Sequence, residues 1–171
     1  ISLKILDKNN IENKNDSNWK ETTKNWLKKY PIVLDKYWKK SSPVNPYCFI
    51  DKLFENLNED NIIVTSDGTA CVTAFQAATI KKGQRMFHNS GCASMGFELP
   101  ASIGAFLASS KTIVCIAGDG SIMMNLQELE TIVGNKFDIK IFLLNNEGYH
   151  SIRQTQNNYF KGNLIGCGKE S

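Results

Sequence analysis

Two stretches decide the fold of this chain: TIVCIAGDGS at residues 112–121 and DIKIFLLNN at residues 138–146. Each is a run of β-branched and apolar residues that ends in glycine or polar residues, which is typical of a strand buried on both faces. Apolar residues at helical spacing predict one helix between them, over about 122–133. They are Leu126, Leu129, Ile132 and Val133, with Gly134 placed to end the helix. A strand, a helix and a strand in this order predict a right-handed crossover with parallel strands.

The flanking sequence extends this alternation. Extended segments are predicted at 61–68 and 85–91, and helices at about 46–57 and 96–108. Pro46 suits the first turn of its helix, because a proline there loses no intrahelical hydrogen bond. Continuous apolar strands separated by helices predict an α/β fold, an open parallel sheet flanked by helices on both faces.

The first 42 residues differ from the rest of the chain in composition and hydrophobic pattern. Asn, Lys, Asp and Glu dominate residues 8–17, which we interpret as a linker because they cannot bury enough apolar surface to order themselves. A helix ended by Pro31 is predicted to follow. We therefore predict a linker and helical arm over 1–42 and a second domain over 43–171, incomplete at its C-terminal end.

Composition limits the classes of function. The 171 residues suit about one domain, and a net charge of +3 is too small to indicate nucleic acid or an anionic membrane surface. The apolar runs are far shorter than the roughly 20 residues that cross a bilayer. Five cysteines without a C-x-x-C pair favour reduced thiols in a cytoplasmic protein, with Cys115 buried on its strand. A chain that begins with Ile1 and has no signal-peptide pattern favours a piece of a longer protein.

Polar residues follow both strands of the crossover. Asp119 lies in a Gly-Asp-Gly turn after the first strand and Asn146 follows the second, and the carboxyl ends of parallel strands meet at one sheet edge. A carboxylate, an amide oxygen and a main-chain carbonyl would make half of an octahedral Mg²⁺ shell, which water and phosphate oxygens usually complete. Gly120 and Ser121 open the next helix, where free N–H groups favour an anion. The pattern predicts a magnesium diphosphate site.

Two other interpretations of these residues are weaker. Gly-Asp-Gly and Asn-Asn-x-Gly are common turn sequences when taken singly, but their combination at crossover spacing favours a site. A dinucleotide fingerprint fails because Met123 stands where its third glycine is needed.

The stretch from 118 to 148 resembles the thiamine-diphosphate motif, GDG followed by some twenty-five residues and then NN. SGCASMGFELPASIGA at 90–105 and MNLQEL at 124–129 resemble in particular the carboxy-terminal cofactor domain of acetolactate-synthase-like enzymes. The resemblance covers about 43–165 and implies the thiamine-diphosphate-binding fold.

The resemblance also implies a set of site residues. Asp119 and Asn146 would bind Mg²⁺ through their side chains and Gly148 through its carbonyl. Met95 would prop the cofactor in a bent form in which its pyrimidine nitrogen reaches the thiazolium C2, and the Ala93 carbonyl would face the aminopyrimidine. The cofactor-binding residues so implied are Thr69, Ala70, Ala93, Met95, Gly118, Gly120, Ser121, Asn146, Gly148, Tyr149 and His150.

Partners follow from the same resemblance. The glutamate that activates the cofactor would come from a pyrimidine-binding domain of the same or the opposing subunit, so no catalytic residue is expected here and the chain alone would be inactive. A homodimer or homotetramer is implied, and FAD, which acetolactate-synthase-like enzymes often carry, would be bound by another domain of the full-length protein. No nucleic-acid or membrane partner is expected.

The implied reaction is decarboxylation of a 2-oxo acid such as pyruvate and transfer of the two-carbon unit to a carbonyl acceptor. Thr155 stands where acetolactate synthases resemble one another in a tryptophan, which keeps open a simple decarboxylase or a ligase with a keto-sugar or aldehyde acceptor. Arg153 would either contact an acceptor through its forked donors or be a solvated charge on a helix. A non-catalytic module that binds cofactor or mediates subunit contact is the alternative of another class.

Overall fold

A computed structural model describes residues 17–40 and 42–168 of the chain. The chain divides into two compact units, Ile1–Ile32 and Val33–Ser171. In the first unit, helix α2 (Ser17–Lys29) brings the rings of Trp19 and Trp26 together edge to face, with centroids 5.6 Å apart. Most of the predicted linker lies outside the described residues, and the domain boundary at 42/43 stays a prediction.

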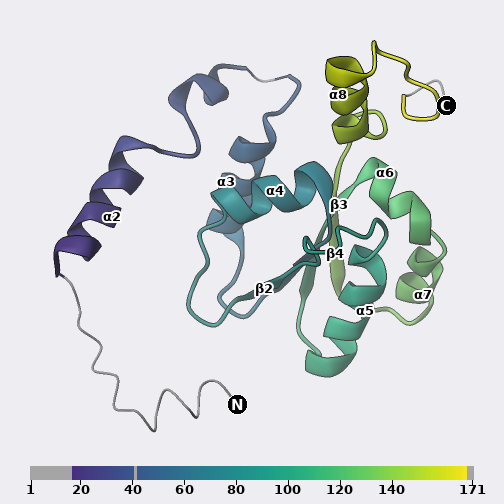
Figure 1. The fold of residues 1–171 in the computed structure, drawn as a ribbon. Helices are drawn as coiled ribbons and strands as arrows, with labels where there is room; N and C mark the ends of the chain where they lie inside the picture. The colour runs from purple at the N-terminus through teal and green to yellow at the C-terminus, as the bar shows by residue number, and fades with distance from the viewer. Residues whose placement is uncertain (1–16, 41, 169–171) are drawn as a thin grey trace, which may run out of the picture. The chain divides into compact units, whose positions relative to one another are not determined.

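The second unit is built on one parallel sheet (Figure 1). Its strands are β1 (Ile62–Thr65), β2 (Arg85–Phe87), β3 (Ile113–Gly118) and β4 (Ile139–Leu144), in the spatial order β2-β1-β3-β4. All three pairings are parallel. The open parallel sheet predicted from the apolar runs is therefore confirmed.

Helices cover both faces of this sheet (Figure 1). Helices α3 (Pro46–Asn56) and α4 (Gly68–Ala77) pack on the face that carries Val114 and Ile116. Helices α5 (Glu98–Ser109) and α7 (Glu128–Gly134) pack on the face that carries Cys115 and Ala117. Because successive strand residues point to opposite faces, the unbroken apolar run of β3 supplies both cores.

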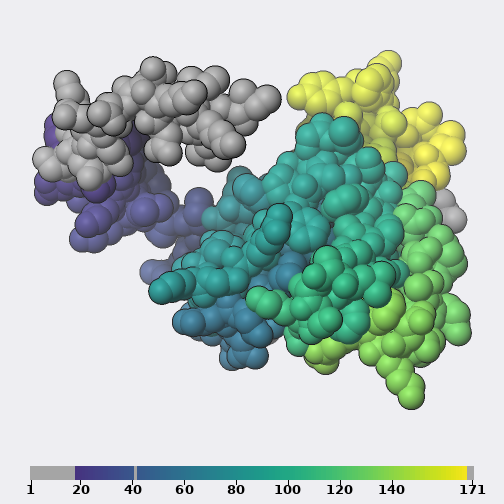
Figure 2. Space-filling view, turned by 90° about the horizontal axis from the view of Figure 1, so that it is seen from below, coloured from purple at the N-terminus to yellow at the C-terminus, as the bar shows by residue number. Residues whose placement is uncertain are grey.

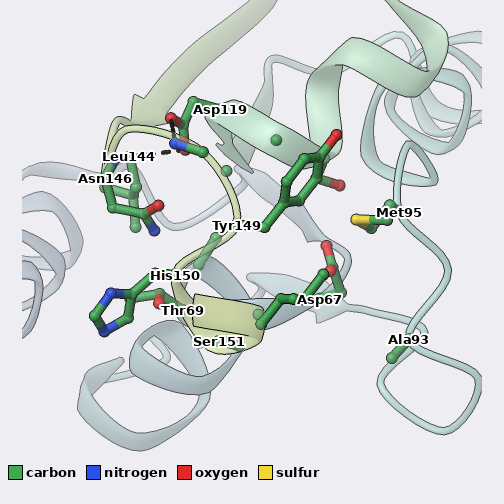
Figure 3. A pocket seen from close by; sticks show the side chains of 17 residues that line it. Asp67, Thr69, Ala93, Met95, Asp119, Leu144, Asn146, Tyr149, His150 and Ser151 are labelled. Atoms are coloured by element: carbon green, nitrogen blue, oxygen red, sulfur yellow. Dashed lines mark hydrogen bonds between the residues drawn. The ribbon is translucent and has the colours of Figure 1, made fainter. Parts of the chain in front are cut away.

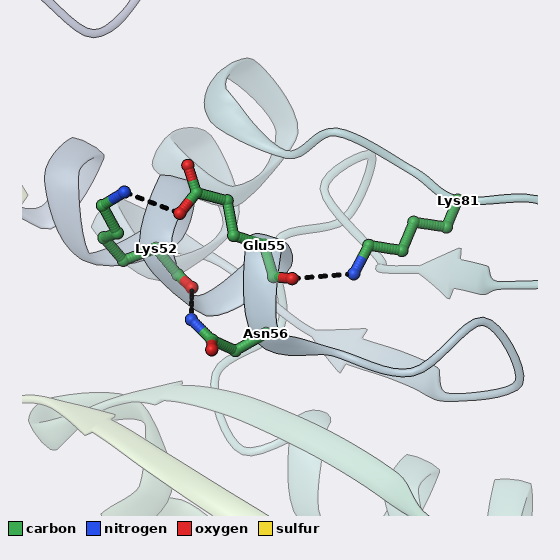
Figure 4. A network of polar contacts seen from close by, with 4 residues as sticks. All are labelled: Lys52, Glu55, Asn56 and Lys81. Atoms are coloured by element: carbon green, nitrogen blue, oxygen red, sulfur yellow. Dashed lines mark hydrogen bonds and ion pairs between the residues drawn. The ribbon is translucent and has the colours of Figure 1, made fainter.

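Helix α3 has defined ends. Pro46 is at its first turn and the Asn45 side chain accepts a hydrogen bond from Tyr47 N, as expected for an N-cap. A short 3₁₀ helix, η1 (Asp35–Lys39), precedes it. At its other end Lys81 Nζ donates to the carbonyls of Glu55, at 2.9 Å, and of Leu57, at 2.6 Å. Figure 4 shows Lys81 reaching the end of α3, where a cation satisfies carbonyls left without helical partners.

The single helix predicted over 122–133 is wrong in its bounds. The structure has α6 (Asp119–Ile122), the 3₁₀ turn η2 (Met123–Asn125) and α7. At this break between α6 and α7, Asn125 Nδ2 donates a hydrogen bond to Gly96 O at 2.8 Å. Ile132 is buried as predicted, but Val133 is 71% exposed and lies outside the buried stripe.

Two helices were not predicted. In α4 the buried residues Ala70, Ala74 and Ala77 recur at helical spacing, and their small size made the stripe weak as a signal. Helix α8 (His150–Tyr159) has no buried residue, so it has no apolar periodicity to find. Among the described residues no helix is both long and apolar enough to cross a membrane.

Helix α8 and the segment that follows lie at one edge of the second unit, in yellow in Figure 2. Figure 1 places α6 and α8 at the same end of the sheet, the end at which β3 and β4 finish. In the register of the sheet Gly118 is the partner of Leu144. The chain therefore leaves β3 and β4 at the same level, and the loops that follow are neighbours.

Candidate functional site

A cavity of about 310 Å³ lies at this carboxyl edge of the sheet. It is lined by residues that follow β1, β3 and β4 and by the loop before α5. The lining residues are Asp67, Gly68, Thr69, Ala70, Ala93, Met95, Gly118, Asp119, Gly120, Ser121, Leu144, Asn146, Gly148, Tyr149, His150, Ser151 and Ile152. Every residue that the sequence pointed to for cofactor or metal is in this set, so the structure brings all of them together.

The Asp119 carboxylate reaches the loop that follows β4. Its Oδ2 accepts a hydrogen bond from Gly148 N at 2.7 Å, and its Oδ1 accepts a longer one from Asn146 N at 3.4 Å. The parallel register places these two loops side by side. The meeting of the two strand ends, on which the magnesium prediction depends, is thus present in the structure through the amides of the second loop.

The donor set fits a hard divalent cation. Asn146 Oδ1 is buried and has no hydrogen-bond partner, and a buried amide oxygen left without a partner costs free energy. The backbone N–H of the same residue donates to the Asp119 carboxylate, and Mg²⁺ prefers amide and carboxylate oxygens as ligands. The described residues contain no cluster of three or more His, Cys, Asp and Glu side chains that could hold a metal. A cation here would use amide and carbonyl oxygens together with Asp119.

Two helices begin at the cavity. Helix α4 starts at Gly68 and α8 at His150, and neither has a side-chain cap on its first N–H groups. The first residues of both helices line the cavity. Free backbone N–H groups and the positive ends of two helix dipoles favour a bound anion.

Figure 3 shows Asp119 and Asn146 on one side of the cavity, Met95 and Ala93 on the other, and the Tyr149 ring between them. A Cβ atom at Gly120 would lie only 2.6 Å from Tyr149 Cε1, so this position has no room for a side chain. Met95 is 39% exposed. A bulky apolar side chain therefore borders the cavity and is not packed away in the core.

The loop that carries Met95 is fixed by the segment after β3. Gly96 N donates to Ser121 Oγ at 2.9 Å, and Gly96 O accepts from Asn125. Gly96 has a φ of 83°, and a Cβ there would lie 2.7 Å from Met124 Cβ, so glycine is required. The loop that carries Met95 is thus joined by hydrogen bonds to the segment after β3, which lines another wall of the same cavity.

A buried polar cluster lies beneath the cavity. Glu98 is fully buried, and its Oε2 accepts hydrogen bonds from Ser66 Oγ at 2.6 Å and from Ser121 Oγ at 3.0 Å. Its Oε1 has no partner. Ser66 follows β1 and Ser121 follows β3, so this carboxyl group of α5 joins two strand ends. No sequence pattern indicates this role of Glu98, because its partners Ser66 and Ser121 are far from it along the chain.

Other residues depart from expectation. Arg153 does not line the cavity, nor is it a solvated charge, because it is half-buried and donates to backbone carbonyls of the β4–α8 loop. Thr155 is exposed, donates to Ser151 O and does not itself line the cavity. Sequence reasoning missed Asp67 and Leu144, although each adjoins a strand end and could have been found by extending the strand-end argument.

Cys115 lies on β3 below this cluster, fully buried as predicted. Burial raises the pKa of its thiol to about 12; a hydrogen bond with Ser102 opposes the shift and the charge of Glu98 adds to it. All five cysteines are free. Cys115 therefore stays a neutral thiol at physiological pH and is not a candidate nucleophile.

Comparison with known proteins identifies the class. Residues 67–170 match the family described as "Thiamine pyrophosphate enzyme, C-terminal TPP binding domain". The match covers more than half of the chain, and the chain belongs to this family.

Relatives narrow the class further. The chain is 30% identical to "Acetolactate synthase isozyme 1 large subunit" of Escherichia coli, over 88% of this chain and 26% of the relative. It is 33% identical to "Acetolactate synthase large subunit" of Cyanidium caldarium, over 89% of this chain and 25% of the relative. The chain is therefore similar to one part of these acetolactate synthase large subunits and spans about a quarter of their length.

A solved structure shares the fold. The thiamine diphosphate-dependent 4-hydroxybenzoylformate decarboxylase of Rhodococcus jostii RHA1 superposes with a TM-score of 0.66 at 22% identity, over 75% of this chain and 24% of that chain. The parallel sheet flanked by helices is therefore the thiamine-diphosphate-binding fold.

Proposed function

We propose that this chain holds thiamine diphosphate together with Mg²⁺ in the cavity at the carboxyl edge of the sheet. The observation that carries the proposal is the buried, unpartnered Oδ1 of Asn146, a residue whose backbone N–H donates to the Asp119 carboxylate, at a cavity where α4 and α8 begin. Asp119, Asn146 and the Gly148 carbonyl would hold the cation. The first N–H groups of α4 and α8, with Gly120 and Ser121, would hold the diphosphate oxygens.

The other cavity residues would position the rings. Met95 would support the cofactor from below, and the Ala93 carbonyl, in a residue with a φ of 52°, would accept a hydrogen bond from the aminopyrimidine. Thr69, Ala70, Gly118, Tyr149 and His150 would complete the contacts. When bound, the cofactor supplies the nucleophilic carbon that attacks a 2-oxo acid. The chain's own task is to orient the cofactor and keep water away from it.

We infer that the whole enzyme decarboxylates pyruvate or a related 2-oxo acid and transfers the two-carbon unit to a carbonyl acceptor. Support comes from relatives that are named acetolactate synthases. Because Thr155 is exposed and not aromatic, a keto-sugar or aldehyde acceptor, or simple decarboxylation, is the second candidate. The activating glutamate would come from a pyrimidine-binding domain of the same or an opposing subunit, in a homodimer or homotetramer that also holds FAD. A cytoplasmic location and inactivity of this chain alone also stay predictions.

A product assay on the complete gene product tests the reaction. With pyruvate as sole substrate, thiamine diphosphate and Mg²⁺, we expect acetolactate. Acetaldehyde without acetolactate would indicate a decarboxylase, and product only when a sugar or aldehyde acceptor is added would indicate the other ligase. No consumption of any 2-oxo acid, with cofactor bound, would favour a non-catalytic module that binds cofactor or mediates subunit contact.

A further inference from the structure

Arg153 makes a set of contacts that the cofactor site does not explain. Its Nη2 donates to Asn146 O at 2.6 Å, and its Nη1 donates to Glu147 O at 2.7 Å and to Cys167 O at 3.1 Å. Cys167 is buried, and its carbonyl also accepts from Tyr149 N at 3.4 Å. One guanidinium therefore joins the loop after β4 to the segment near residue 167.

The loop that Arg153 contacts has an intrinsically unfavourable backbone conformation. Glu147 has a φ of 62° and Gly148 a φ of 107°, so two successive residues lie in the left-handed region. For a residue other than glycine this conformation costs of order 1 kcal/mol or more. The negatively charged Asp119 accepts hydrogen bonds from backbone N–H groups of the loop, and the positively charged Arg153 donates to its backbone carbonyls. Both side chains therefore hold the same few residues, 146–148.

We propose that Arg153 is a positioning residue for the cation site, an inference that rests on the proposed function. By occupying the carbonyls of Asn146 and Glu147, it fixes the two peptide planes between Asn146 and Gly148 and leaves the Gly148 carbonyl to the cation. Only a planar fork reaches these carbonyls at once; a lysine ammonium supplies the charge without the geometry. With its donors engaged in this way, Arg153 does not bind the substrate.

The proposal is tested on the complete gene product with Arg153→Met and Arg153→Lys. Arg85, the other arginine of the chain, is exposed on β2, and Arg85→Met and Arg85→Lys are the matched controls. Mn²⁺ binding in the presence of thiamine diphosphate is measured by electron paramagnetic resonance, and amide exchange is measured in the Mn²⁺-free protein. We expect Arg153→Met to weaken Mn²⁺ by about 10- to 100-fold, the effect usual for groups that orient metal ligands, with Arg153→Lys between. Both Arg85 variants should match the wild type.

The exchange measurement separates positioning from general stability. In Arg153→Met we expect faster exchange over residues 145–149 and unchanged exchange in β3. Unchanged Mn²⁺ affinity, or faster exchange that extends equally through β3, would overturn the proposal. If the wild-type protein binds no Mn²⁺ with the cofactor, the proposed function fails, while the exchange result still decides whether Arg153 orders the loop.

Discussion

The ends of β3 and β4 meet at one cavity but are built in different ways. The end of β3 is fixed from below by buried side chains, with Glu98 joining Ser66 and Ser121. The end of β4 is fixed by its own backbone, whose amides bind Asp119 and whose carbonyls bind Arg153. A buried cluster of side chains therefore determines the end of β3. The conformation of the loop after β4 determines the end of β4, and Asp119 and Arg153 stabilise that loop.

We expect the two strand ends to differ in rigidity and therefore in their roles. A fully buried cluster changes only when the core around it changes, so the end of β3 is a rigid reference for the site. A loop held by a few backbone hydrogen bonds opens more readily than a core strand. We therefore expect mutations in the buried cluster of Glu98, Ser66 and Ser121 to act mainly on stability, and mutations in the loop after β4 to act mainly on ligand binding.

The largest stability effect should come from Glu98→Ala. Removing the carboxylate leaves two buried hydroxyl groups with fewer partners and opens a cavity, which together cost roughly 2–4 kcal/mol. Glu98→Gln keeps an oxygen acceptor and should cost less. Chemical denaturation measures both, with the exposed Glu130→Ala as control. A loss no greater than that of the control would show that the buried cluster does not brace the end of β3.

A smaller effect is expected from Gly148→Ala at the end of β4. Its φ of 107° is unfavourable for alanine, and the new Cβ would lie 3.2 Å from Arg153 Nη1 and 3.3 Å from Cys167 O. We expect a loss of about 1–2 kcal/mol in the free energy of unfolding and a larger relative loss of Mg²⁺ affinity. Gly134→Ala, whose Cβ would meet nothing closer than 3.9 Å, is the control and should be close to neutral. Equal effects at both glycines would contradict this account of the β4 loop.

A further effect, confined to alkaline pH, is a pH dependence set by Cys115 in the core beneath the end of β3. Its pKa is raised in the folded protein from 9.0 to about 12, so folding favours the neutral thiol. The resulting stability is complete below pH 9.0 and is lost as the pH rises toward 12. One thiol adds a slope of at most about 1.4 kcal/mol per pH unit. Denaturation at several alkaline pH values should give a shallower slope in Cys115→Ala than in the wild type, with the exposed Cys92→Ala as the control substitution.

The sequence was sufficient to predict the sheet and the residues that gather at its edge. The apolar runs of β3 and β4 identified parallel strands, and parallel strands bring Asp119 and Asn146 to one edge whatever the details of the intervening helix. That is why the break between α6 and α7 did not affect the site. The placement of Asp119 and Asn146 followed from the strand ends, whereas Thr69, Ala70, Ala93, Met95, Tyr149 and His150 were implied only by the family resemblance.

What could not be predicted depends on side chains that act across the fold. Glu98 looks like an ordinary first-turn acid of a helix, and only the structure shows that it is buried between two serines that are 32 and 23 residues away. Arg153 was assigned either to a substrate or to solvent, because no sequence pattern indicates that a guanidinium binds backbone carbonyls of a preceding loop. Helix α8 has no buried face, so periodicity could not reveal it.

Calorimetric titration of thiamine diphosphate into the complete gene product, with and without Mg²⁺, tests the central claim most directly. We expect Mg²⁺-dependent binding in the wild type and in the surface control Asp60→Asn. Asp119→Asn keeps the shape of the side chain but should lose about 100-fold or more in cofactor affinity, since it replaces the charged ligand of the cation with a neutral amide. Cofactor binding that is independent of Mg²⁺, or equally tight in Asp119→Asn, would contradict the claim that the ends of β3 and β4 share one cation.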